Sequence, residues 1–411
     1  MVELGLDTFG DMTKGIDGQP KRMDQVLRDV VDEAVLADQV GVDFIGLGEH
    51  HRPDFAISSP EIVLAAIAGR TSRIRLGTAV TVLSTDDPVR VFQRFSTLNA
   101  VSNGRAEVIL GRGSFTESYP LFGYQMDDYD QLFEEKLDLF AKLVKNDTVT
   151  WSGELRSGLT NQRVYPPLGP KGMTTWVGVG GSPDSVVRVV RQDLQLMLAI
   201  IGGDPRRFLP YIDLYERACT ELGKIVKPVG VHSPGFVAAT DAEAREAAWP
   251  AYHDMFGRIG RERGWPPTTK DKFLAEVEHG ALYIGSPETV ARKIAATVRD
   301  LKLARFDMKY TTGPIDTAAQ MESSGFTAKL SCRWSGICWR RTAFAKAEPK
   351  SFRKDLQIPS KEFGAPTETS RPAPPYPCHT DRRHRCSRPK PVSTVSRAGA
   401  SPARLTGSPP C

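Results

Sequence analysis

The feature that most constrains this chain is Phe44–Gly48, an apolar, glycine-interrupted run that leads directly into a carboxylate and two imidazoles at Glu49–His51. Upstream, apolar residues recur at helical spacing over Met23–Val40. Downstream, Pro60–Arg70 predicts a second helix and Ile74–Leu83 a second buried strand. This order is typical of a parallel α/β fold. Such folds place their chemistry at the ends of the strands, and the polar cluster lies at such an end.

The alternation of strands and helices continues along the chain. The predicted strands are Val2–Thr8, Phe44–Gly48, Ile74–Leu83, Ala106–Leu110, Thr175–Val179, Leu196–Ile201, Pro228–Ala238 and Phe306–Tyr310. The predicted helices are Met23–Val40, Pro60–Arg70, Pro88–Ala100, Asp130–Val144, Pro183–Arg191, Asp204–Leu222, Asp241–Arg263 and Ser286–Leu301. This count predicts an α/β fold of the (β/α)8 TIM-barrel type, while periodicity leaves a doubly wound open sheet as the alternative. Two stretches, Trp151–Lys171 and Gly264–Gly280, are predicted to be irregular insertions that become lids or active-site walls.

Composition divides the chain into two parts. Residues 1–315 carry a net charge of −5 and one cysteine, Cys219, whereas residues 316–411 carry a net charge of +10 and five cysteines. The first part is long enough for one barrel, so we expect a domain at 1–315 followed by a basic tail at 316–411. The single cysteine favours a reducing compartment, and no signal-peptide pattern or membrane-length apolar run is found. We therefore expect a cytoplasmic protein with no membrane partner.

Glycine clusters follow two successive predicted strands. Arg112 stands between two glycines after the fourth strand, where it can grip an anion bidentately. Gly180, Gly181 and Ser182 follow the fifth strand and open a helix whose free amides face a positive helix end. Glycines in such turns are commonly turns and nothing more. Together with the arginine, these two clusters favour a ligand that carries a phosphate.

Several of these motifs occur in the order found in a known family. Glu49-His50-His51, the Gly77–Val80 run, Gly104-Arg105 and Gly111–Gly113 resemble the bacterial luciferase-like flavin-dependent monooxygenases. The resemblance covers about residues 2–315. It implies a (β/α)8 barrel that binds FMN at its C-terminal face, usually as a homodimer. It also implies reduced flavin supplied by a separate flavin reductase, O2 as a co-substrate, and a small organic substrate. Other members of the superfamily use F420 for hydride transfer without oxygen.

The resemblance implies roles for the residues near the flavin ring. His50 matches the histidine beside the reactive edge of the flavin, where it acts in proton transfer, and an imidazole with a pKa of about 6.5 suits this task at neutral pH. The junction of Ala79 and Val80 matches a non-proline cis peptide that presses against the ring. Glu49 and His51 point away from His50 on a strand, and we expect them to be structural.

The resemblance also implies a phosphate site. Arg112 matches the residue that holds the flavin phosphate, aided by amides at Gly180, Gly181 and Ser182. In the luciferase branch of the family an acidic residue stands where Gly181 falls. This departure leaves only a backbone donor at that position.

Other classes of function remain open from the sequence. Adjacent histidines lie on opposite faces of a strand, so they do not chelate a metal together. His232, on the seventh predicted strand, still leaves a metal-dependent barrel hydrolase as an alternative, and we expect no metal. A flavin-binding protein without catalysis is a third class, and F420-dependent dehydrogenation is the main rival among enzymes. Tyr119, Trp151 and Trp265 are equally compatible with a substrate wall and with the core.

The tail at residues 316–411 holds 12 of the 30 prolines and has little apolar periodicity. This composition predicts disorder, and the spacing of its cysteines and histidines matches no zinc pattern. We expect no nucleic-acid partner for it. An Arg-, Pro-, Ser- and Cys-rich stretch is what a high-GC gene gives in the wrong reading frame, so a frameshift after about residue 320 is predicted. Resequencing the gene tests this, because the other frame should encode an amphipathic helix.

Overall fold

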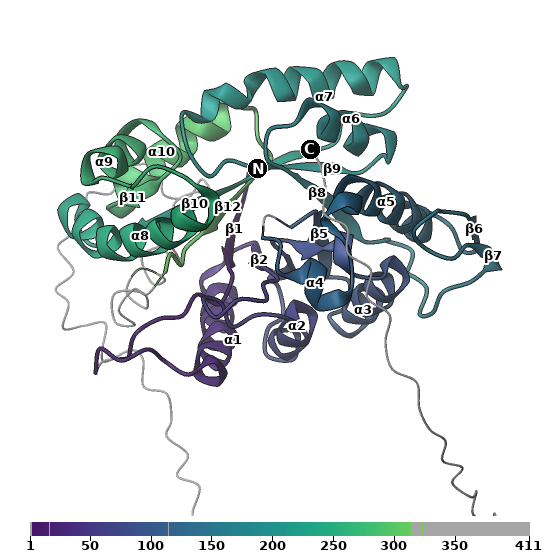
Figure 1. Ribbon diagram of the computed structural model, residues 1–411, viewed down its shortest axis with the longest axis horizontal. Helices are drawn as coiled ribbons and strands as arrows, with labels where there is room; N and C mark the ends of the chain where they lie inside the picture. The colour runs from purple at the N-terminus through teal and green to yellow at the C-terminus, as the bar shows by residue number, and fades with distance from the viewer. Residues whose placement is uncertain (1, 16, 114, 314–322, 324–411) are drawn as a thin grey trace, which may run out of the picture. The chain divides into compact units, whose positions relative to one another are not determined.

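The computed structural model describes residues 2–15, 17–113, 115–313 and residue 323 (Figure 1). The predicted tail, its disorder and the frameshift hypothesis lie outside these described residues, apart from the single residue 323. The same holds for the helix that would follow the last strand.

Parallel strands form one sheet that curves into a barrel. The strands of the sheet are β1 (Glu3–Thr8), β2 (Phe44–Leu47), β3 (Arg75–Thr78), β4 (Thr81–Val82), β5 (Glu107–Gly111), β8 (Thr174–Val179), β9 (Gln195–Ala199), β10 (Val229–Val237), β11 (Tyr283–Gly285) and β12 (Arg305–Lys309). Their order is β3-β2-β1-β12-β10-β9-β8-β5-β4, with β11 on the far half of β10. A parallel bridge between Leu76 and Ala106 closes the gap between β3 and β5. If β3 and β4 are counted as two halves of one strand, the described part of the barrel wall has the eight strand positions that the sequence predicts.

Helices pack around the strands (Figure 1). They are α1 (Met23–Val40), α2 (Pro60–Ala68), α3 (Pro88–Val101), α4 (Ser118–Phe122), α5 (Tyr129–Lys145), α6 (Pro183–Arg191), α7 (Leu209–Glu221), α8 (Asp241–Arg263), α9 (Lys270–His279) and α10 (Pro287–Asp300), with short 3-10 turns η1 (Leu83–Thr85), η2 (Met126–Asp128) and η3 (Pro205–Phe208). Their boundaries have local causes. Asp87 caps α3 by accepting from the amide of Val89, Thr240 forms a capping box with Glu243, and Gly41 ends α1 in the left-handed conformation.

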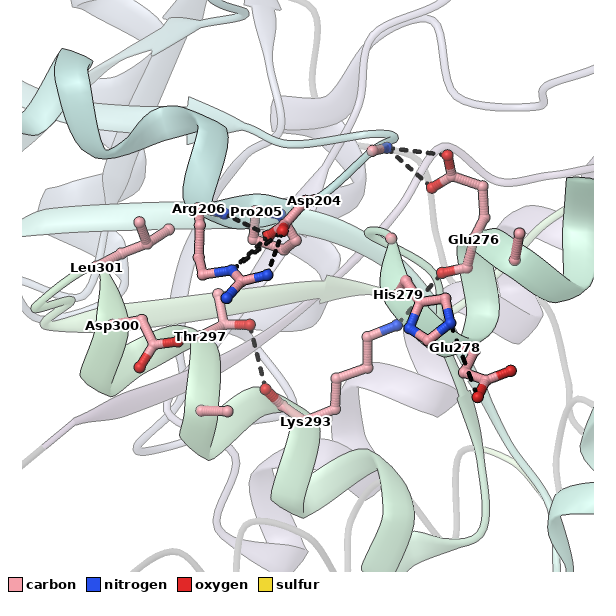
Figure 2. A pocket seen from close by; sticks show the side chains of 14 residues that line it. Asp204, Pro205, Arg206, Glu276, Glu278, His279, Lys293, Thr297, Asp300 and Leu301 are labelled. Atoms are coloured by element: carbon pink, nitrogen blue, oxygen red, sulfur yellow. Dashed lines mark hydrogen bonds and ion pairs between the residues drawn. The ribbon is translucent and has the colours of Figure 1, made fainter.

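The two insertions are more regular than the sequence predicts. The first contains part of the antiparallel pair β6 (Val149–Trp151) and β7 (Leu159–Gln162). The second contains α9, whose start is capped by Thr269 accepting from the amide of Lys272. With η3 and α10, α9 lines a cavity of about 580 Å³ (Figure 2). The sequence does not predict these short elements, because each buries only part of its surface and so carries few apolar residues at regular spacing.

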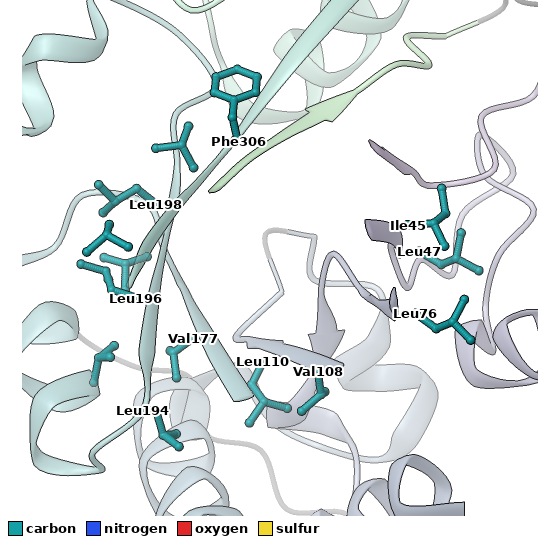
Figure 3. Packing of buried hydrophobic residues seen from close by; sticks show 14 of the residues in the cluster. Ile45, Leu47, Leu76, Val108, Leu110, Val177, Leu194, Leu196, Leu198 and Phe306 are labelled. Atoms are coloured by element: carbon teal, nitrogen blue, oxygen red, sulfur yellow. The ribbon is translucent and has the colours of Figure 1, made fainter. Parts of the chain in front are cut away.

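Side chains alternate between two cores along each strand. The outer core lies between strands and helices and includes Ile45, Leu47, Leu76, Leu110, Leu196 and Phe306 (Figure 3). The inner core fills the barrel with Phe44, Ile109, Trp176 and Met197, against which Val80 packs. Because both faces of the strands are covered, the strands read as continuous apolar runs. The chemistry is therefore confined to the few polar side chains that the strands point inward or carry at their ends.

Candidate functional site

His50 follows β2 and lies among three aromatic rings at the C-terminal ends of the strands. Its ring centroid is 4.4 Å from that of Phe9, 4.5 Å from Phe55 and 5.1 Å from Phe115. Its backbone amide donates to the carbonyl of Ile57 at 2.9 Å, which fixes the chain after the strand. These three phenylalanines were not singled out together by the sequence, because they come from three different loops.

The surroundings of His50 keep its imidazole neutral. Burial lowers the pKa of His50 to about 3, and the positive charges of Lys309, His51 and Arg52 act in the same direction. The expectation of a pKa near neutrality is therefore wrong for this histidine. The reason is that its neighbours are apolar rings and cations.

Glu49 and His51 form a separate pair, as expected. His51 Nε2 lies 3.0 Å from Glu49 Oε1, and the second carboxylate oxygen of Glu49 accepts from the amide of Val82 at 2.8 Å. The pair thus ties the end of β2 to β4. These contacts fit the structural role expected for Glu49 and His51.

The peptide between Ala79 and Val80 is cis and separates β3 from β4. Glycines on the neighbouring strands make room for both side chains. A Cβ added at Gly46 would lie 3.0 Å from the Ala79 Cβ, and one added at Gly111 would lie 2.4 Å from Val80 Cγ2. Any side chain at position 111 would therefore displace Val80 from the inner core.

Arg112 follows β5 and is engaged by an acidic partner. Its guanidinium donates to Asp130 at 2.6 Å and lies 5.2 Å from the centroid of the Tyr129 ring. Both charged side chains are partly exposed, so the pair is weak and exchangeable. The arginine can therefore turn from Asp130 to a bound anion at low cost.

Gly180, Gly181 and Ser182 join β8 to α6, on the strand next to β5. Ser182 caps α6 by accepting from the amide of Ser185 at 3.4 Å. Gly181 has a φ of +113°, which favours glycine, and its carbonyl accepts from the hydroxyl of Tyr211 at 2.6 Å. Arg112 and the start of α6 thus follow adjacent strands.

A second imidazole, that of His232 in β10, also lies near the ring of Phe9. His232 Nδ1 is 2.7 Å from Asp7 Oδ2, and the His232 ring stacks on Phe9 with an interplanar angle of 7° and a centroid distance of 6.3 Å. The sequence places His232 on the seventh predicted strand but gives no sign of its partner. Asp7 lies 225 positions earlier in the chain.

The remaining candidates divide between core and surface. Tyr119 and Trp151 are buried core residues, and Trp265 is partly exposed. The cavity of Figure 2 lies outside the barrel, and it contains none of the predicted site residues. There Lys293 Nζ donates to the carbonyls of Val277 and Leu282, both at 2.7 Å, and burial lowers its pKa to about 8. These contacts fasten the end of α9.

In residues 2–313, gaps excepted, no group of three or more His, Cys, Asp or Glu side chains is arranged to hold a metal ion. Over the same part of the chain, every helix is too short or too polar to cross a membrane.

Comparison with known proteins gives a consistent result. The family model described as luciferase-like monooxygenase matches residues 9–304. The alkanal monooxygenase alpha chain of the Kryptophanaron alfredi symbiont is 25% identical over 234 residues, covering 56% of this chain and 64% of that protein. The oxygenase component of flavin-dependent trigonelline monooxygenase from Acinetobacter baylyi is 23% identical over 255 residues, covering 61% and 70%.

The solved structures share the fold. Monooxygenase RslO1 from Streptomyces bottropensis superimposes with a TM-score of 0.68 at 21% identity, covering 81% of this chain and 99% of that one. At this identity the likeness shows the barrel and nothing finer. The chain spans about half to two thirds of the length of the first curated relatives that it matches.

Proposed function

This chain belongs to the luciferase-like monooxygenase family, and from that premise we propose that it is the oxygenase of a two-component flavin monooxygenase. In this proposal it takes reduced FMN from a separate flavin reductase and uses O2 to oxygenate a small organic substrate. A homodimer is part of the same proposal. The trigonelline enzyme, named as an oxygenase component, supports the reductase as a partner.

A glycine-lined path at the C-terminal ends of the strands supports a flavin. Gly46 and Gly111 make room for Ala79 and Val80, and the carbonyl of Val80 accepts from the amide of Glu49, which precedes His50, at 3.2 Å. Apart from Gly180 and its two chain neighbours, no atom of the described residues lies within 4 Å of where a Cβ on Gly180 would stand. The start of α6 adds free amides and a positive helix end beside that space. These residues fit a planar ring at one end and a phosphate at the other.

Each residue has a distinct task in this proposal. Ala79 and Val80 support the flat face of the ring, while Arg112 and the amides of Gly180, Gly181 and Ser182 hold the phosphate. Reduced flavin, when bound, supplies the electrons that activate O2. His50 stands at the reacting edge as a neutral imidazole, which can donate from one nitrogen and accept at the other. The rings of Phe9, Phe55 and Phe115 exclude water around it.

The apolar and aromatic surroundings of His50 favour a substrate of modest polarity. Lys309 and Arg52, whose charges act on His50, are already engaged: Lys309 Nζ donates to Asp11 at 3.0 and 2.9 Å, and Arg52 donates to Glu262 at 2.8 and 2.7 Å. A strongly charged substrate would find no free countercharge among these four groups. An uncharged substrate is therefore proposed.

Cofactor titration tests the proposal. Purified protein is titrated anaerobically with reduced FMN and, in parallel, with reduced F420, and binding is followed by fluorescence. We expect FMN to bind with the higher affinity. Oxygen consumption is then measured with a flavin reductase and NADH over a panel of uncharged organic substrates. If the protein binds F420 and not FMN, the proposal is wrong and an F420-dependent oxidoreductase that transfers hydride takes its place. If it binds FMN but substrates do not stimulate oxygen consumption, the protein is a flavin carrier.

A further inference from the structure

The Asp7–His232 pair crosses the inside of the barrel. His232 in β10 is in register with Asp307 of β12, and β12 in turn pairs with β1, which carries Asp7. The bond between His232 and Asp7 therefore spans the intervening strand, so both side chains point inward. Asp7 is fully buried, whereas the side chain of His232 keeps 13% of its surface exposed. The histidine is thus the accessible end of the pair.

Buried carboxylates and cations lie beside this pair. Arg305 donates to Asp307 at 2.8 Å and to Glu107 at 2.6 Å, and Arg75 lies 2.7 Å from the other oxygen of Glu107. Within the described residues, Asp7 Oδ1 and Asp307 Oδ2 are buried without a hydrogen-bond partner. The Asp7 carboxylate therefore has spare acceptor capacity, and its charge and hydrogen bond favour the protonated form of His232.

The charge state of His232 follows from all the groups that face it. Burial alone lowers its pKa, but the charge and hydrogen bond of Asp7, helped by Asp307, outweigh burial and Lys309, and the pKa is raised. Lys309 opposes this only weakly because Asp11 neutralises it. Burial also raises the pKa of Asp307 to about 6, against the attraction of Arg305. Asp7 therefore favours the protonated form of His232, whereas the surroundings of His50 favour its neutral form.

Both imidazoles lie against the ring of Phe9. His50 is 4.4 Å from that ring and His232 stacks on it at 6.3 Å. Two titratable groups whose surroundings push their pKa values apart are the usual arrangement for an acid and a neutral partner in one site. The barrel mouth therefore holds one imidazole whose pKa is lowered, that of His50, and one whose pKa is raised, that of His232.

We propose that His232, held and charged by Asp7, is the proton donor of the site, and that His50 is its neutral partner. The inference rests on the proposed function, since the acceptor is a basic atom of the ligand bound at the barrel mouth. In this step the Nε2–H bond of His232 breaks, the proton passes to the ligand, and the bonding electron pair stays on the imidazole. Asp7 keeps its contact with Nδ1 of His232 and is a positioning residue. Solvent then returns a proton to His232.

Histidine titration tests the charge state without any flavin. The full chain, labelled with ¹⁵N in histidine, is titrated by NMR, with His232→Gln used to assign the signal. We expect the His232 midpoint above 6.5, and in Asp7→Asn we expect it to fall by at least one pH unit. If the Asp7→Asn variant does not fold, the titration midpoint of His232 in the wild type alone decides whether the proposal holds. A midpoint below 6.5 in the wild type, or one unmoved in a folded Asp7→Asn variant, would overturn the proposal.

A pH profile tests the role in the reaction. Reoxidation of protein-bound reduced FMN by O2 is followed by stopped flow for the wild type, His232→Gln and the control His279→Gln, whose histidine is largely exposed at the end of α9. We expect the wild-type rate to fall as pH rises through the His232 midpoint. His232→Gln should be slower by about 10²-fold or more and lack this limb, whereas His279→Gln should match the wild type.

The outcomes separate the two proposals. If the wild type fails to bind reduced FMN, the proposed function is wrong, although the NMR midpoint still reports on His232. If FMN binds and His232→Gln keeps the wild-type pH limb, the inference about His232 is wrong and the proposed function stands.

Discussion

Val80 occupies the space that any side chain at position 111 would need: a Cβ on Gly111 would lie 2.4 Å from Val80 Cγ2. The two residues belong to neighbouring strand segments, and Val80 packs on the inner core of the barrel. The glycine at the end of β5 therefore sets where the floor of the proposed flavin site lies.

We expect Gly111→Ala to force Val80 from its place and to lower the free energy of unfolding by about 1–3 kcal/mol, the usual cost of overpacking. Affinity for reduced FMN should fall as well, because the displaced residue belongs to the proposed ring support. Gly69→Ala is the control, since a Cβ there would lie 3.7 Å from its nearest neighbour at a φ of −72°. Urea unfolding and flavin titration measure both effects. Equal stability of the two variants would show that Val80 can move freely.

Arg112→Ala should weaken the binding of reduced FMN by tenfold or more, since a hydrogen bond between charged groups contributes about 1.5–3 kcal/mol. The thermal midpoint of the flavin-free protein should change little, because the pair with Asp130 is exposed. Asp130→Asn is the matched variant. It releases the guanidinium, so FMN affinity should be unchanged or higher. If both variants destabilise the protein equally and leave affinity alone, the arginine is structural.

His50→Gln should make the protein less sensitive to acid. The pKa of His50 is lowered to about 3 in the fold, whereas the unfolded chain takes up this proton near its ordinary pKa of about 6.5. Stability from the neutral ring is thus present above pH ~6.5 and is lost as pH falls toward 3. Between pH 7 and 5 the wild type should lose up to about 2 kcal/mol more than His50→Gln. Urea unfolding at both pH values gives the difference, with His279→Gln as the control.

Turnover should also depend on His50. Because this imidazole stands at the reacting edge in the proposal, His50→Ala should keep the fold and most flavin affinity but lose turnover by about 10²–10⁴-fold. Substrate-dependent oxygen consumption with a reductase measures this. A variant with wild-type turnover would remove His50 from the mechanism.

The bidentate pair of Arg52 and Glu262 should restrain α8 over the loop that follows β2. Arg52 donates to both carboxylate oxygens at 2.8 and 2.7 Å, and its guanidinium lies 4.8 Å from the centroid of the Phe115 ring beside His50. Glu262→Ala should raise hydrogen–deuterium exchange in Asp241–Arg263 by a few-fold, in keeping with about 0.5–1 kcal/mol for a partly exposed pair. Added salt should do the same to the wild type but not to the variant. The control Glu278→Ala removes an exposed carboxylate on α9 and should leave exchange in α8 unchanged.

The sequence predicts the barrel well because burial on both faces makes each strand a continuous apolar run. It also predicts helix ends where a capping residue is present, as at Ser286 before α10.

The sequence predicts the site only in part. The polar end of β2 was visible, but the opposed charge states of His50 and His232 depend on neighbours that come from other strands and loops. The cis Ala79–Val80 peptide has no local signature and was expected from the family resemblance alone.

Asp11 accepts hydrogen bonds from Lys309 and from the amide of Gly313, which lies 302 positions later, and β1 pairs with β12 at the same seam. During synthesis this seam cannot form until almost all of the barrel has left the ribosome, which at about 5–20 residues per second takes roughly 15–60 s. Until then β1 has no partner on that side, and the nascent sheet keeps an exposed strand edge of the kind that recruits other chains. The seam that completes the barrel thus also sets the period in which the growing chain most needs protection from aggregation.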